Sequence, residues 1–352
     1  MKKIDDFDGF IGLIYTFLTL MKSAGTFPNL LKPKKKDLRF SIFMEVFTPL
    51  YEQYEQKLKS TSSIDFNDMI NHAKGFIQNG EFKRKYKYIL VDEFQDMSQG
   101  KYALLSAFKS AYPPAKLYCV GDDWQSIFRF AGSDVSVLSQ FSNHFGITAY
   151  NPVLQTYRFN TEILNVSSSF IQKNPAQLPK KLHSPFDSTL PAFQLIPLNP
   201  KRLKKAEADH YRFERIHEIL LGISKISPRA SIFLIGRYNH NRPMSMAALQ
   251  KMHPQVRIAF HTAHGSKGLT CDYAILLGVE SGVFGFPSEV ADDAVLSYLL
   301  QVEERYENAE ERRLFYVALT RARHKVFLMY DIRFPSKFID ELKADYDLEI
   351  NR

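Results

Sequence analysis

Two adjacent carboxylates follow an apolar run in the first third of the chain. The run Tyr88–Val91 ends at Asp92 and Glu93, within the string VDEFQD. One carboxylate in such a place can hold Mg²⁺, usually through water, and the next can orient and deprotonate an attacking water. An Asp-Glu pair after a strand is common, so the pair alone does not favour a functional role. The longer string is far more specific.

A second string combines acids, an amide and aromatic side chains. GDDWQSIFRFAG, from Gly121 to Gly132, places Gln125 after two aspartates and alternates Phe128 and Phe130 around an arginine. The amide of a glutamine can sense a γ-phosphate, and an aromatic ring can contribute roughly 1–3 kcal/mol by stacking on a base. Taken alone, the two phenylalanines are better explained as core residues.

Three further strings carry arginines, histidines and hydroxyl groups. In the last of them, Leu314, Val317 and Ala318 recur at helical spacing as a packing face. Arg313 and Arg321 could then be presented toward a crevice. The planar guanidinium suits a phosphate, and an arginine can stabilise charge that develops in phosphoryl transfer. Either arginine alone is better explained by a surface helix with ion pairs to neighbouring glutamates. The three strings are LQTYRF (154–159), AFHTAHGSKGL (259–269) and EERRLFYVALTRAR (310–323).

Apolar runs that end in glycine, an acid or an arginine recur from residue 86 onwards. Stretches with helical spacing separate them, a pattern typical of buried parallel strands in an α/β fold. In that fold, polar residues just past the strands face the ligand crevice. Residues 1 to about 60 are predicted to be helical instead. The predicted strands lie at 88–91, 117–120, 231–235, 273–277 and 326–330.

Length and composition exclude several classes of protein. The chain has 352 residues, 45% hydrophobic and 24% charged, which fits about two globular domains and excludes disordered or collagen-like chains. Two cysteines cannot build a disulfide framework and fit a reducing, cytoplasmic location. The longest apolar run, 10–21, is too short to span a bilayer, so no membrane partner is predicted. The net charge of +8 suggests a polyanionic partner only weakly.

Taken together and in this order, the five strings resemble motifs II to VI of superfamily 1 DNA helicases of the UvrD/Rep type. Within that family, DEFQDMSQGKY, GDDWQSIFRFAG and TYRFN are similar to the helicase IV branch. The resemblance covers residues 61 to 335 and implies an α/β fold of RecA-like parallel sheets flanked by helices. The expected organisation is a helical segment at 1–60, an N-terminally truncated first RecA-like domain at 61–150 and a nearly complete second one at 151–352.

The resemblance also implies a nucleotide site in the cleft between the two RecA-like domains, with ATP and Mg²⁺ as cofactors. Asp92 would hold the metal ion, Glu93 would be the catalytic base and Gln125 would contact the γ-phosphate. The second domain would supply Arg158 at the γ-phosphate, Tyr157 near the nucleotide base and Arg321 as an arginine finger.

The implied partner is single-stranded DNA, or DNA with a 3′ single-stranded tail. Family members move 3′ to 5′ and unwind duplexes with the energy of ATP hydrolysis. By the resemblance, Phe128 and Phe130 would stack on bases, and Thr262 and His264 would contact the DNA backbone.

Two features depart from the family pattern. No P-loop of the form G-x-x-x-x-G-K-[ST] occurs in these 352 residues, and only 91 residues precede Asp92. The P-loop makes most of the contacts to the phosphates, so we expect the C-terminal portion of a helicase that needs a P-loop-bearing segment in trans. The second departure is that only 102 residues separate Phe159 from Thr262. We therefore expect the extra domain that larger relatives insert there to be absent or vestigial.

Two other functions remain to be weighed. A non-enzymatic DNA-binding or regulatory module could keep the fold after losing turnover, although retention of the carboxylates, glutamine and arginines named above argues against it. A nuclease is disfavoured, because the sequence has no carboxylate-lysine cluster outside the helicase strings and no zinc-type spacing of Cys and His.

Overall fold

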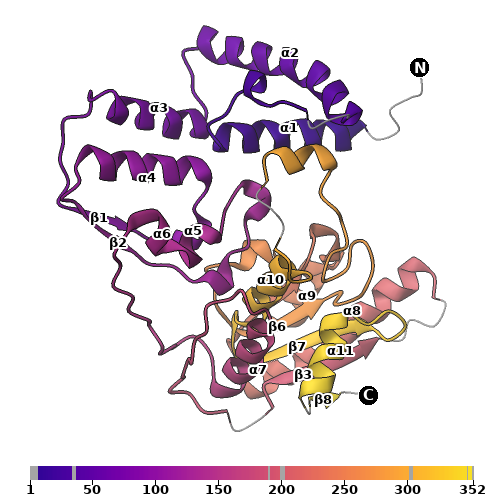
Figure 1. Cartoon of the computed structure of the whole chain (residues 1–352). Coiled ribbons are helices and arrows are strands. Elements are labelled where there is room, and N and C mark those ends of the chain that lie inside the picture. Colours follow the sequence, from indigo (N-terminus) through magenta and orange to yellow (C-terminus); the bar gives the residue numbers. More distant parts are fainter. Residues whose placement is uncertain are drawn as a thin grey trace. The chain divides into compact units, whose positions relative to one another are not determined.

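The chain divides into two compact units. The computed structural model describes residues 7–33, 37–188, 191–198, 203–300, 304–346 and 348–350. The first unit comprises Met1–Thr148 and Ala291–Glu304, and the second comprises Ala149–Val290 and Arg305–Arg352 (Figure 1). Within the described ranges, no helix is both long enough and apolar enough to cross a membrane.

Most of the first unit is helical. Phe17, Phe40 and Phe47 form the centre of an aromatic core between its first two helices. The segment 291–304 returns to this core, where the ring of Tyr298 stacks on Phe40 with 3.6 Å between centroids. The boundary predicted near residue 150 assigned this segment to the second domain, whereas it packs in the first unit. The helices are α1 (Phe7–Ser23), α2 (Leu38–Ser60), α3 (Phe66–Gln78), α4 (Gln99–Ala111), α5 (Ser136–Ser139) and α6 (Phe141–Phe145), with short 3₁₀ turns that include η7 (Ala294–Tyr298).

A short parallel sheet completes the first unit. Strand β1 (Tyr88–Val91) pairs in register with β2 (Lys116–Cys119). One face of the pair packs against buried side chains that include Phe94 and Leu105. The opposite face is apolar but exposed: 70% of the Tyr88 side chain, 73% of Leu90 and 64% of Tyr118 are accessible to solvent. A parallel sheet is normally covered on both faces, so this bare face is unusual.

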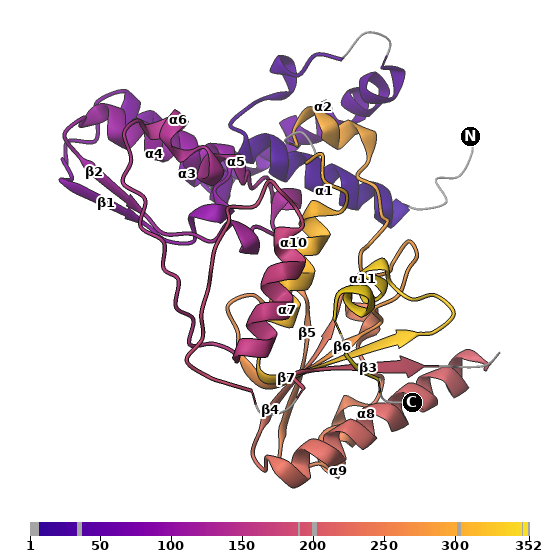
Figure 2. The same ribbon diagram turned by 60° about the horizontal axis from the view of Figure 1, so that its bottom comes forward.

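The second unit is built on a six-stranded sheet with the order β5-β4-β6-β7-β3-β8, in which every pairing is parallel. Helices cover both faces, with α8 and α9 on one side and α7, α10 and α11 on the other (Figure 2). The strands are β3 (Phe193–Leu198), β4 (Ser231–Gly236), β5 (Arg257–Thr262), β6 (Cys271–Leu277), β7 (Ala322–Asp331) and β8 (Glu349–Ile350); the helices are α7 (Thr161–Gln172), α8 (Lys205–Ile226), α9 (Met246–Met252), α10 (Ala309–Leu319) and α11 (Lys337–Asp345).

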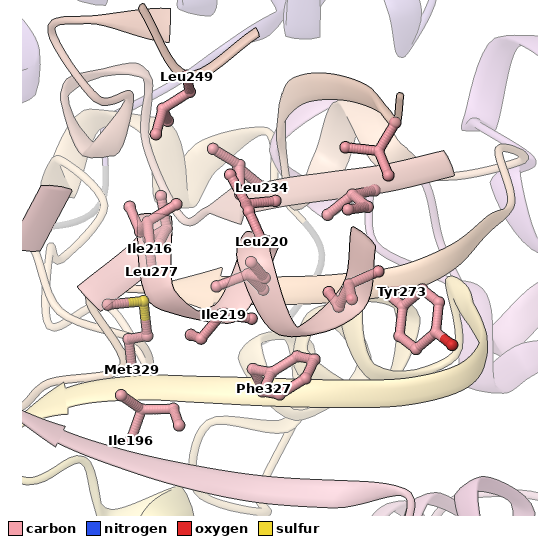
Figure 3. Packing of buried hydrophobic residues seen from close by; sticks show 14 of the residues in the cluster. Ile196, Ile216, Ile219, Leu220, Leu234, Leu249, Tyr273, Leu277, Phe327 and Met329 are labelled. Carbon is pink, nitrogen blue, oxygen red and sulfur yellow. The ribbon is translucent and has the colours of Figure 1, made fainter. Parts of the chain in front are cut away.

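Alternating strand and helix patterns produce the main core of the second unit. Ile216, Ile219 and Leu220 recur at helical spacing on α8 and pack on the side chains that the strands present to that face (Figure 3). Phe327 and Met329, two residues apart on β7, lie on the same face of the sheet because strand side chains alternate. The predicted α/β class with parallel sheets flanked by helices is confirmed. The described residues between 160 and 261 all belong to this unit, and no inserted domain interrupts them.

A buried ion cluster joins three helices of the first unit. The ammonium group of Lys22, at the end of α1, lies 2.6 Å from a carboxylate oxygen of Glu55, 2.7 Å from Asp65 and 2.8 Å from Asp68. Burial alone would lower the pKa of Lys22, but the hydrogen bonds to the three carboxylates outweigh burial and raise it. Burial alone would likewise raise the pKa of Asp65, but hydrogen bonds from Lys22, the Asp68 backbone and Tyr54 lower it.

We predict that Lys22→Met destabilises the first unit by about 3–5 kcal/mol, because it leaves a set of partly buried carboxylates without their cation. Hydrogen exchange of the α1, α2 and α3 peptides measures this. The contribution of ionised Asp65 to the free energy of unfolding is present at neutral pH and is lost as the pH falls through its lowered, folded-state pKa. In acid, the difference in unfolding free energy between the wild type and Lys22→Met should therefore become smaller. Lys57→Met, at an exposed position on α2, is the matched control. Equal exchange in the two variants would contradict the prediction.

Candidate functional site

The two predicted catalytic carboxylates lie in the turn after β1. Asp92 and Glu93 are both exposed, and Glu93 has left-handed backbone angles, φ 49° and ψ 43°. The Glu93 N–H donates to the Asp92 carboxylate at 2.8 Å, which holds the turn. Among the described residues, no group of three or more His, Cys, Asp and Glu is placed to hold a metal ion. The donor set that the turn does offer, two exposed carboxylates, is of the kind that Mg²⁺ uses, because this ion commonly binds through one or two carboxylates together with waters and phosphate oxygens.

Gln95 connects this turn to the loop that follows β2. Its side chain is 1% exposed. The amide N–H donates to the Glu93 carboxylate, and the amide oxygen accepts the backbone N–H of Asp122 at 2.8 Å. The hydroxyl of Ser126 also donates to the Gln95 carbonyl, at 3.1 Å. Sequence reasoning gave Gln95 no role; the only signal was its place within VDEFQD.

The predicted γ-phosphate sensor lies in the same network. The amide of Gln125 donates to the Asp122 carboxylate at 2.6 Å, and that carboxylate also accepts the backbone N–H of Trp124 at 3.2 Å. The structure therefore links Glu93 to Gln125 through Gln95 and Asp122, all within the first unit. An amide can both donate and accept, so one buried glutamine fixes an acid from one loop against the backbone of the other.

The two aromatic residues predicted to stack on DNA come shortly after Gln125 in the sequence. Phe128 and Phe130 meet edge to face, with 6.0 Å between ring centroids and 66° between ring planes. Phe130 is half exposed, whereas Phe128 is partly buried. Arg129 between them forms an ion pair with Asp292 of the returning segment. The ring of Phe130 is therefore accessible to a ligand.

In the second unit, Tyr157 and Arg158 line a cavity of about 1040 Å³. Its lining includes apolar side chains such as Ile219, Ile223 and Phe327, several cationic side chains and the acids Asp187 and Glu218. Tyr157 is mostly exposed and contacts the ring of Phe186 edge to face. Among the residues that the structure describes, none forms a hydrogen bond or ion pair with the Arg158 guanidinium. The cavity thus combines an aromatic ring with a guanidinium that has no partner among the described residues.

Arg313 and Arg321 are not presented to a crevice, contrary to the prediction. The side chain of Arg321 is fully buried, and its guanidinium donates to the carbonyls of Val317 at 2.7 Å and Leu269 at 3.2 Å. Arg313 is buried as well. The helical pattern suggested one packing face, but α10 is buried around its whole circumference, so its arginines point into protein. The alternative of a surface ion-paired helix is wrong for the same reason, and Glu311 pairs with Arg237 instead.

Thr262 and His264 lie at the carboxyl end of β5. Thr262 is the last residue of the strand, and its hydroxyl oxygen accepts the backbone N–H of Gly265 at 3.1 Å. His264 begins the 3₁₀ turn η6 (His264–Ser266). Both side chains are partly buried. They occupy the edge of the sheet where ligands bind in open parallel folds.

Comparison with protein families gives the class of these two units. Residues 16–146 match the UvrD/REP helicase N-terminal domain, and residues 238–332 match the UvrD-like helicase C-terminal domain. The two matches define a helicase-type α/β protein. The chain belongs to the UvrD/Rep-type helicase family, as the five sequence strings predicted.

Individual relatives agree with this family. The chain is 37% identical to DNA helicase IV of Escherichia coli over 304 residues, which cover 86% of this chain and 42% of that protein. It is 30% identical to DNA helicase II of Rickettsia typhi over 48% of this chain and 26% of that protein. It is also 30% identical to the ATP-dependent DNA helicase UvrD1 of Mycobacterium leprae, over 38% of this chain and 19% of that protein. The chain therefore spans less than half the length of each of these relatives.

We predict that Gly121→Ala disturbs the network around Gln95. A Cβ atom at this position would lie 2.9 Å from the Gln95 amide oxygen and 3.1 Å from the Gln95 backbone nitrogen. Overpacking of this kind costs about 1–3 kcal/mol, so amide exchange in peptides covering 92–98 and 120–126 should accelerate. Gly75→Ala is the control, because nothing lies within 4 Å of its added Cβ and alanine favours a helix interior. Unchanged exchange in Gly121→Ala would show that the two loops are not tightly coupled.

Proposed function

We propose that this chain supplies the motif II to VI part of an ATP-driven DNA helicase that moves 3′ to 5′ along single-stranded DNA. The observation that carries the proposal is the hydrogen-bonded chain from Glu93 through Gln95 and Asp122 to Gln125. It fixes an acid and an amide side by side at the carboxyl edge of a parallel sheet, as hydrolysis of a nucleoside triphosphate requires.

In this proposal four residues of the first unit have distinct roles. Asp92 would hold Mg²⁺, and the ion would supply positive charge beside the phosphates. Glu93 accepts the proton of the water that attacks the γ-phosphate. Gln125 contacts the γ-phosphate. Gln95 touches no substrate; it positions the Glu93 carboxylate.

The second unit contributes the remaining contacts to ATP. Arg158 donates to the γ-phosphate, which is supported by the absence of any partner for its guanidinium among the described residues. Tyr157 stacks near the base, which is supported by its exposure beside the large cavity. Arg321 can act as an arginine finger only after its guanidinium leaves the carbonyls of Val317 and Leu269.

The DNA contacts are assigned to both units. Phe130 and Phe128 stack on bases, and Thr262 and His264 contact the backbone of single-stranded DNA. The exposure of Phe130 and the position of Thr262 at the carboxyl end of β5 support this assignment.

We further propose that a P-loop from outside these 352 residues completes the nucleotide site. The exposed apolar face of β1 and β2 supports this proposal, because a parallel pair of strands gains stability when further strands and helices cover it. Tyr88, Leu90 and Tyr118 are the side chains that such a segment would bury.

The test is ATP turnover by the chain alone and by the chain mixed with the part of E. coli DNA helicase IV that its match to this chain does not cover. We expect the chain alone to show no turnover stimulated by single-stranded DNA, and the mixture to hydrolyse ATP and to unwind a 3′-tailed duplex but not a 5′-tailed one. Glu93→Gln should abolish turnover in the mixture and leave DNA binding intact. Robust turnover by the chain alone would refute the need for a second segment. DNA binding without turnover in any combination would favour a non-enzymatic module.

A second prediction concerns the nucleotide contact of the second unit. Arg158→Ala should weaken binding of a fluorescent ATP analogue to the completed protein by roughly tenfold or more, because a charge-assisted hydrogen bond to phosphate is lost. Arg215→Ala is the matched control, since Arg215 lines the same cavity but is paired with Glu218 at 2.6 Å. Equal affinities for the two variants would remove Arg158 from the site.

A further inference from the structure

The loop after β4 carries an aromatic cluster that the proposed function leaves unused. Strand β4 ends at Gly236, which lies in register with Thr262 of β5 and with Leu277 of β6. The backbone N–H of Ala263 donates to the Gly236 carbonyl at 2.8 Å, which brings the next residues of the two strands together. The loop that follows Gly236 therefore begins next to the backbone between Thr262 and His264, the proposed DNA contacts.

Three planar groups form a column in this loop. The Arg237 guanidinium lies 4.5 Å from the centre of the Tyr238 ring. The ring of His240 stacks on Tyr238, with 5.3 Å between centroids and 14° between planes. Phe284, from the loop after β6, meets both rings edge-on, at 5.8 Å from Tyr238 and 6.0 Å from His240. His240 is exposed and the side chain of Phe284 is 64% exposed.

The column is held in place before any ligand arrives. The Arg237 guanidinium makes a two-pronged contact with Glu311, at 2.7 Å and 3.0 Å. The backbone N–H of Ser288 donates to the same carboxylate at 2.9 Å, and the Ser288 hydroxyl lies 2.6 Å from the Tyr238 hydroxyl. Burial alone would lower the pKa of Arg237, but the bonds to Glu311 outweigh it and raise the pKa. The base of the column is thus an ion pair that hydrogen bonds hold in place.

Glycines let the loop turn at this point. The backbone N–H of Tyr238 donates to the Asn241 side chain at 2.9 Å. A Cβ at Gly236 would lie 2.4 Å from the Asn241 Cβ, and a Cβ at Gly278 would lie 2.8 Å from its amide nitrogen. The two glycines therefore allow Asn241 to fold under the loop and raise Tyr238 and His240 toward solvent.

We propose that His240 and Phe284, supported by Tyr238, form a nucleobase-stacking platform for single-stranded DNA. Preorganised aromatic faces are exposed at the ligand-binding edge of the sheet, and base stacking on such faces tolerates any sequence. Exposed Arg242, directly after this loop, provides a cation for the adjoining phosphate. The platform rests on the proposed binding of single-stranded DNA and adds a contact that the five motif strings do not contain.

The experiment measures the binding of the full chain to two fluorescent oligonucleotides of equal length, oligo(dT) and a fully abasic deoxyribose-phosphate strand. The wild type should prefer oligo(dT). His240→Ala and Phe284→Ala should each reduce affinity for oligo(dT) about fivefold or more and leave affinity for the abasic strand unchanged, because only base contacts are lost. Met244→Ala, at an exposed residue four positions after His240, is the control and should change neither affinity. Phe284 is exposed, so its removal should not unfold the unit, and thermal melting checks this.

Each outcome decides a separate claim. If the wild type binds neither oligonucleotide, the proposed DNA binding and the platform both fail. If it binds oligo(dT) but the two variants match the wild type, the platform alone fails. An equal loss for both oligonucleotides would assign these residues to backbone contact and overturn base stacking. An equal loss of affinity for oligo(dT) in Met244→Ala would show that the loss does not depend on the aromatic rings, and the platform would fail.

Discussion

The parallel alignment of the strands is the constraint on which both units depend, because it brings the carboxyl ends of neighbouring strands to one edge. In the first unit the pairing of β1 and β2 continues beyond the strands themselves. The Val120 N–H donates to the Val91 carbonyl, and the Phe94 N–H donates back to the Val120 carbonyl, both at 2.9 Å. The turn with Glu93 and the loop with Asp122 are therefore adjacent before any side chain is considered, and Gln95 needs only to bridge them. In the second unit the same rule gathers the ends of β4, β5 and β6.

Close backbone approach then limits which residues can stand at these edges. Gly121 leaves room for the Gln95 amide, and Gly236 and Gly278 leave room for Asn241. In both places an amide side chain fills the space that a Cβ would occupy and accepts a backbone N–H, from the neighbouring loop for Gln95 and from its own loop for Asn241. In each case the glycine has no Cβ, and this leaves room for the amide side chain to make its hydrogen bond.

Secondary-structure elements marked by a local residue pattern could be predicted from the sequence. Elements whose formation depends on residues distant in the sequence could not. Apolar runs locate β1, β2, β4, β6 and β7 to within a few residues, and the motif strings order the loops. Strand β3 was missed because Gln194 and Pro197 interrupt its apolar run, and β5 because it is an edge strand that begins at Arg257 and is only partly buried. The packing of segment 291–304 with α1 and α2 joins residues more than 250 positions apart, as in the bond from Tyr298 to Asp37, and no local pattern encodes it.

The difference between local and distant contacts also explains why the arginines of α10 are buried, although the spacing of its apolar residues predicted only one packed face. Spacing predicts which residues share a helix face, but not whether the remaining faces are also covered. Arg312 illustrates the result: it is buried, makes a two-pronged pair with Glu341 of α11 at 2.7 Å and lies 4.3 Å from the Phe170 ring. Arg321, by contrast, donates to the neutral carbonyl groups of Val317 and Leu269. Neutral acceptors bind a guanidinium less strongly than charged oxygens do, so these two bonds of Arg321 are weaker than the pair between Arg312 and Glu341.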